Sequence, residues 1–145
     1  MAGLTFRSIL ATGSGDLGDA RGPAGEGVFD LFFRDIDLPG LVDLPALIVF
    51  ATKKVDLDKN FVTINAPEQV TAQSFDEARG EPYFIWRVLP NPTDIWTLQM
   101  HQIGPGRLKP SGNVLGIHTR NDDGEQAATR DDFAVARIFL VYHAA

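Results

Sequence analysis

The chain has 145 residues, of which 44% are hydrophobic and 22% charged, and its formal net charge is −6. This length is typical of one domain, which can bury enough surface to fold without disulfides or a structural metal. The acidic balance disfavours nucleic acids and anionic membranes as partners, since both attract basic surfaces. The chain has no cysteine, which excludes a disulfide framework and a thiolate zinc site.

The N-terminal sequence MAGLTFRSIL lacks the apolar core of a secretory signal. The longest apolar runs, LPALIVFA and FAVARIFLVY, are too short to cross a bilayer as helices. We therefore expect cytoplasmic synthesis without a signal peptide, and no membrane insertion.

The first predicted strand, Leu4–Ala11, leads into a glycine-rich stretch over residues 12–27. Its letters GSGDLG match the G-x-G-x-x-G fingerprint of dinucleotide-binding proteins, in which the third glycine opens a phosphate-binding helix. A proline and three glycines follow within residues 22–27, and a proline costs about 3 kcal/mol in a helix interior. We therefore predict a loop at 12–27, either mobile or ordered by a neighbouring subunit or ligand.

Apolar and polar residues alternate along most of the chain, with turn sequences such as DLDKN, ARGEP and PNPT between the alternating segments. The 14 glycines and 9 prolines interrupt any helix of three turns or more. The pattern predicts a single all-β domain over residues 1–145, an antiparallel β-sandwich or jelly roll of about eight or nine strands. The predicted strands are Leu4–Ala11, Val28–Ile36, Ala46–Ala51, Phe61–Asn65, Gln69–Phe75, Tyr83–Leu89, Ile95–Ile103, Val114–His118 and Phe133–His143.

Two of these strands, Tyr83–Leu89 and Ile95–Ile103, flank PNPTD and predict a β-hairpin with a five-residue loop. In this register one face is apolar and is expected to be the core face, with the pairs Val88–Trp96, Trp86–Leu98 and Phe84–Met100. The other face combines aromatic, guanidinium and amide groups, which suit sugar or protein recognition, although plain solvent exposure is an alternative. The candidate binding residues on that face are Tyr83, Arg87, Thr97, Gln99 and His101.

The last predicted strand is apolar on both faces, which predicts a central strand covered by a second layer or by a neighbouring subunit. Its single charge, Arg137, is expected to be buried and to need a partner. Simple alternation places Phe133, Val135, Phe139 and Val141 on one face and Ala134, Ala136, Ile138, Leu140 and Tyr142 on the other.

Two acidic loops, DLDKN and NDDGE, offer oxygen ligands of the kind that calcium prefers. Neither loop has the spacing of an EF-hand, and solvated turns are the alternative interpretation. The candidate calcium ligands are Asp56, Asp58, Asn60, Asp122 and Asp123.

Catalytic motifs are not found in the sequence. His101, His118 and His143 fall on three predicted strands and could supply zinc ligands, but no H-x-H or HExxH spacing supports that hypothesis. No serine lies in G-x-S-x-G.

We therefore predict a non-enzymatic structural or assembly protein that forms a homo-oligomer. A virion or phage appendage, or another particle with a surface-recognition role, is the expected setting. The first alternative is a lectin-like carbohydrate-binding module that binds a glycan or protein surface, with calcium as its one candidate cofactor. The second is a small metal-dependent jelly-roll enzyme.

Overall fold

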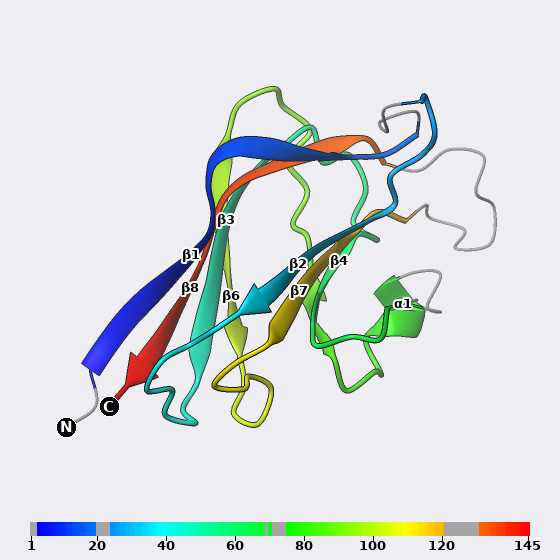
Figure 1. Ribbon diagram of the computed structural model, residues 1–145. Helices are drawn as coiled ribbons and strands as arrows, with labels where there is room; N and C mark the ends of the chain where they lie inside the picture. Colours follow the sequence, from blue (N-terminus) through cyan, green and yellow to red (C-terminus); the bar gives the residue numbers. More distant parts are fainter. Residues whose placement is uncertain (1–2, 20–23, 69, 71–74, 121–130) are drawn as a thin grey trace.

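The computed structural model describes residues 3–19, 24–68, 70, 75–120 and 131–145 and forms a sandwich of two four-stranded antiparallel sheets (Figure 1). The first, here called the β1 sheet, has the order β1 (Gly3–Leu17), β8 (Phe133–Ala144), β3 (Ala46–Lys53) and β6 (Thr97–Ile103). The β2 sheet has the order β2 (Asp30–Ile36), β7 (Asn113–His118), β4 (Phe61–Ile64) and β5 (Phe84–Arg87). The predicted all-β sandwich is confirmed.

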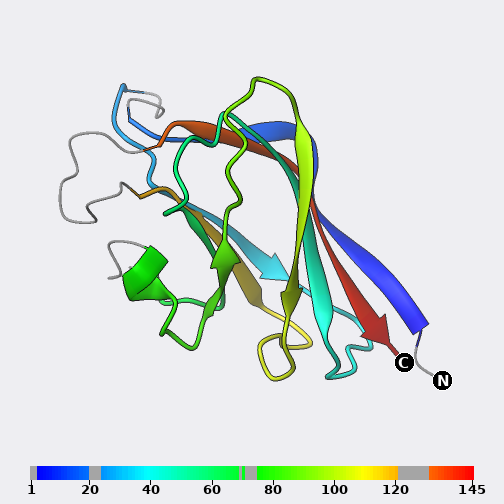
Figure 2. The same ribbon diagram turned by 180° about the vertical axis from the view of Figure 1, so that it is seen from behind.

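The strand pairing has jelly-roll topology. The first strand pairs with the eighth, the second with the seventh, the third with the sixth and the fourth with the fifth. The chain therefore resembles one long hairpin rolled up so that successive strand pairs alternate between the two sheets, as the views from both sides show (Figures 1 and 2).

The predicted hairpin between the fifth and sixth strands is wrong. β6 pairs with β3 over Ala46–Thr52, and β5 pairs with β4, so the two strands belong to different sheets. The connecting segment contains two prolines, which cannot donate ladder hydrogen bonds. Within it, Asn91 forms two backbone hydrogen bonds with Val55, both of 2.8 Å, which direct the chain from one sheet to the other.

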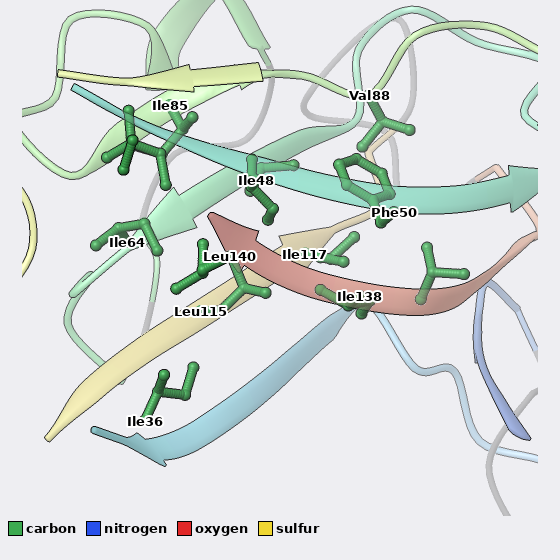
Figure 3. Close-up of a cluster of buried hydrophobic side chains, with 14 of the residues drawn as sticks. Ile36, Ile48, Phe50, Ile64, Ile85, Val88, Leu115, Ile117, Ile138 and Leu140 are labelled. Atoms are coloured by element: carbon green, nitrogen blue, oxygen red, sulfur yellow. The ribbon is translucent and has the colours of Figure 1, made fainter. Parts of the chain in front are cut away.

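Aliphatic side chains from both sheets fill the space between them (Figure 3). Ile48, Phe50, Ile138 and Leu140 project from the β1 sheet, and Ile36, Ile64, Leu115, Ile117 and Ile85 project from the β2 sheet. All of them are buried, so this layer is the main hydrophobic core.

A β-bulge at Arg137 changes which side chains of β8 face this core. Arg137 has a left-handed φ of 52°, and the β3–β8 register shifts by one residue between Val49 and Ala51. An inserted residue turns every later side chain of the strand to the opposite face of the sheet, so strict alternation is wrong for β8. The residues that face the core are Phe133, Val135, Ile138, Leu140 and Tyr142, whereas Phe139 and Val141 face outward. Arg137 is exposed rather than buried, and its Nη1 donates to the Ala11 carbonyl.

The glycine-rich stretch is not wholly a loop as predicted. Residues 12–17 continue β1, and Ser14–Leu17 pair with β8, with Gly15 opposite Val135. Gly18 has a φ of 131°, and a Cβ there would lie 1.7 Å from Asp132 Oδ1. The glycine allows the Asp19 backbone N–H to donate to that oxygen at 2.7 Å. Residues 20–23 lie outside the described residues.

The outer side of the β2 sheet has a small cover of its own. The short helix α1 (Phe75–Ala78) packs Phe75 and Ala78 against Phe61 and Phe84. The strand predicted at Gln69–Phe75 is not confirmed, because Phe75 begins this helix and residues 69 and 71–74 lie outside the described residues. The other eight predicted strands are present, with shifted ends.

Candidate functional site

The five residues of the predicted recognition face do not share a face. Gln99 and His101 point into the sandwich and are buried, whereas Thr97, at the start of the same strand, is exposed. Tyr83 immediately precedes β5 in the other sheet and Arg87 ends that strand, with its Nη1 3.8 Å from Asp58 Oδ2. The structure therefore does not assemble them into one platform.

Gln99 and His101 instead form an internal hydrogen-bond network. The Gln99 Oε1 accepts from the Leu89 backbone N–H at 2.9 Å and from the His101 Nε2–H at 2.8 Å. The Gln99 amide nitrogen donates to Thr52 Oγ1 on the neighbouring strand β3 at 3.1 Å. The bond from Leu89, which follows β5, joins β6 to the end of the β2 sheet. Burial lowers the pKa of His101 to about 4, which keeps its ring neutral at physiological pH.

The structure describes three of the calcium candidates, Asp56, Asp58 and Asn60, and the Asp56 backbone N–H donates to Asp131 Oδ2 at 3.1 Å. Asn60 is fully buried, its Nδ2 donates to Asp131 Oδ2 at 2.7 Å, and its Oδ1 accepts from the Arg120 backbone N–H at 2.9 Å. Asp58 lies beside Arg87. Asp122 and Asp123 lie outside the described residues, so calcium binding stays a prediction.

A second internal network surrounds His118. Its Nδ1–H donates to Asp30 Oδ1 at 2.7 Å, and its Nε2 accepts from the Thr63 hydroxyl at 2.8 Å. Burial opposes ionisation of Asp30, but the hydrogen bond from His118 and the charge of Arg120 outweigh it and lower the pKa of that carboxyl. Burial is also the main cause that lowers the pKa of His118.

Thr63, His118 and Asp30 occur in the order of a nucleophilic triad, yet they cannot act as one in this structure. Both Thr63 and His118 are fully buried, and the His118 ring stacks on Phe61 with a centroid distance of 4.8 Å. A nucleophile must reach a substrate carbonyl, and the buried Thr63 hydroxyl has no path to one.

Within the described ranges, no three His, Asp or Glu side chains gather as a metal site would require. No helix there is long and apolar enough to cross a membrane.

The main unpartnered feature of the described surface is the outer side of the β1 sheet. Register places apolar residues from all four strands in adjacent rows: Phe6, Val141 and Leu47 in one row, and Phe139, Val49 and Met100 in the next. We call this surface the outer apolar face. It comprises Leu4, Phe6, Leu47, Val49, Leu98, Met100, Phe139 and Val141.

The outer apolar face is well exposed at its edges. The exposed fractions are 69% for Leu4, 69% for Phe6, 65% for Leu98 and 63% for Met100. Shallow hollows lie between Phe6 and Phe139 and beside Val141. The outward-facing rows that begin at Leu4, Phe6 and Ser8 contain no Asp, Glu, Lys or Arg, although the chain has a net charge of −6.

The sequence contains a signal for this face, which the predicted hairpin assigns to the core. Leu98 and Met100 alternate with Gln99 and His101, and the hairpin register turns the apolar pair inward. The two polar residues point inward instead, because they satisfy each other's hydrogen bonds.

No protein-family model matches the chain, and no curated protein matches it. Among solved structures it is similar to the K1 cleaved adhesin domain of Lys-gingipain from Porphyromonas gingivalis W83. The two are 12% identical with a TM-score of 0.37, over 100% of this chain and 98% of that chain. A similarity at this level carries no argument about function.

Proposed function

We propose that this protein is a non-enzymatic assembly module whose copies associate through the outer apolar face. The observation that supports the proposal is the extent of that face, which spans four strands and is uncharged at its centre. Jelly rolls serve in viral capsids and lectins, among other roles, so the fold is compatible with a virion or another particle without selecting one.

The size of the face is sufficient for association. Aromatic side chains bury about 150–250 Å² each, and we take about 200 Å² for each of the four residues, three of which are Leu or Met. At the exposed fractions of Leu4, Phe6, Leu98 and Met100, the four leave roughly 500 Å² of apolar surface, at the upper end of what monomers normally expose. A standard interface buries ~800 Å² per partner, so these four residues supply more than half of that area.

Charge supports another copy of the chain as the partner. Acidic proteins repel each other over their surfaces, and an uncharged face is the part where two copies meet without that cost. The outer apolar face is also self-complementary in chemistry, as a twofold interface requires.

Light scattering on the purified chain and on Met100→Lys tests the proposal. At a protein concentration of about 100 µM, we expect the natural sequence to have a mass of two or more times 15.8 kDa. We expect Met100→Lys to be a monomer, because association would bury the lysine in the interface without a charged partner. Trp86→Lys is the matched control, since Trp86 is an exposed apolar residue on the other sheet. A monomeric natural protein, or equal dissociation by both variants, would refute the proposal.

A further inference from the structure

A depression of about 390 Å³ lies on the β1 sheet beyond the outer apolar face, at the level of the β8 bulge. It is lined by Gly13, Ser14, Ala51, Trp96, Ala136 and Arg137. Its volume falls within the range of small-molecule sites, about 300–1,000 Å³.

Irregularities in two adjacent strands create the depression. β8 bulges at Arg137, and the β1–β8 register shifts between Leu10 and Ser14, where Gly13 has a φ of 73°. The floor consists of Ala51 and Ala136, which oppose each other across β3 and β8. Because neither side chain extends beyond Cβ, the space above them stays open.

The walls carry three different chemical groups. Trp96 is 42% exposed and presents its indole, with the Lys53 Nζ 4.8 Å from the ring centroid. Ser14 contributes a hydroxyl from β1. Arg137 contributes a guanidinium that the Ala11 carbonyl holds in place through Nη1.

Arg137 carries the one charge among the residues that line the depression, and Asp16 lies in the next outward-facing row, opposite Ala134. Lys53 is offset by Asp94 at 3.4 Å, whereas Arg137 forms no ion pair with any part of the chain that the structure describes. Its remaining N–H groups form the planar fork that matches a carboxylate.

We propose that this depression binds a saccharide ring that bears a carboxylate, a hexuronic acid residue of a glycan. The ring's C–H face stacks on Trp96, its carboxylate accepts from Arg137, and a hydroxyl bonds Ser14. Arginine and an aromatic side chain together supply both the charge and the flat surface that such a ring requires. This activity goes beyond self-association and uses the neighbouring part of the same sheet, where Leu98 of the outer apolar face is opposite Ala51 of the depression floor.

Tryptophan fluorescence with methyl β-D-glucuronide as the probe tests the site. The chain has two tryptophans, and Trp86 lies on the other sheet, so Trp86→Ala leaves Trp96 as the sole reporter. We expect a saturable change in its emission, with a Kd of about 1 mM or tighter. Adding Arg137→Gln should weaken binding about tenfold or more, the usual effect of losing a charge-assisted hydrogen bond.

Arg107→Gln is the matched control for Arg137→Gln, because Arg107 also donates through Nη1 to backbone carbonyls but lies outside the depression. We expect it to change the affinity by about twofold at most. Methyl β-D-glucoside, which lacks the carboxylate, should bind about tenfold more weakly than the glucuronide.

The proposal is overturned if the glucuronide gives no saturable signal, or if the two arginine variants bind it equally. It is also wrong if Arg137→Gln lowers the mass in light scattering while the glucuronide does nothing, since a neighbouring copy then fills the depression. A monomeric natural protein that binds the glucuronide would refute the assembly proposal and support this one.

Discussion

Protonation of His101 should make the protein less stable in acid, and the structure gives the size of the effect. His101 is 8% exposed, packs near Phe50 and has a pKa of about 4 in the folded chain, against an ordinary value of 6.5. The gap corresponds to about 3 kcal/mol of unfolding free energy at ~1.36 kcal/mol per pH unit.

The sign follows from where the proton binds. Above pH 6.5 the ring is neutral in both the folded and unfolded chain, so His101 contributes no pH dependence. Between pH 6.5 and 4 the unfolded chain takes up a proton that the folded chain does not, and stability falls with decreasing pH. His118 contributes in the same direction, because its pKa is also lowered, whereas the raised pKa of Asp131 contributes in the opposite direction.

Comparison with His101→Gln isolates the contribution of His101. Glutamine keeps an N–H that can donate to Gln99 but does not titrate. From urea unfolding at pH 7 and pH 4.5, we expect the natural protein to lose about 2.5 kcal/mol more than the variant between the two pH values. If both proteins lose the same amount, the ring is not held neutral by burial and the reasoning fails.

Two further substitutions test the internal networks by urea unfolding. Gly116→Ala should lower the free energy of unfolding by about 1–3 kcal/mol, because its Cβ would lie 2.4 Å from Thr63 Oγ1 and 2.6 Å from His118 Nε2. An unchanged free energy of unfolding would contradict the close packing of Gly116 against that pair. Asp131→Asn should lower the free energy of unfolding by about 1–3 kcal/mol, because the Asp131 carboxylate accepts hydrogen bonds from the Asp56 and Leu57 amides and from Asn60. For the same reason, hydrogen exchange at those two amides should become faster. Unchanged exchange at both amides would show that other contacts hold this loop.

The strand positions could be predicted because alternation with period two is a local property of the chain. Their pairing could not, because a jelly roll pairs Gly3 with Ala144 and Asp30 with His118, across almost the whole sequence. The predicted hairpin assumed that neighbouring strands pair. The Asn91–Val55 bridge overrides that assumption, since it turns the chain before β6 can meet β5.

The faces of β6 show why the candidate site was missed. Alternation reveals that Leu98 and Met100 share one side and that Gln99 and His101 share the other, but it does not say which side is buried. Polar side chains are normally placed outside because burying them unpaired is costly. Here that cost is removed by the hydrogen bonds among Gln99, His101 and Leu89, so the apolar side can face outward. Local patterns that conflict with the fold in this way are expected at functional or strained sites, and this expectation supports the assembly proposal.

The bulge at Arg137 links the core, the outer apolar face and the depression. Without the extra residue, alternation from Phe133 onward would point Phe139 and Val141 into the core and Ile138 and Leu140 outward. The left-handed residue lets a single strand supply apolar side chains to the core at both ends while still presenting Phe139 and Val141 outside. An arginine with a φ of 52° lacks the conformational freedom of glycine, so stability alone would favour glycine there. Asp35, Lys54 and Asn65 have a similar left-handed φ, so this backbone conformation alone does not single out Arg137. What sets Arg137 apart is the position of its guanidinium, which donates to the Ala11 carbonyl and lines the depression where the proposed carboxylate would bind.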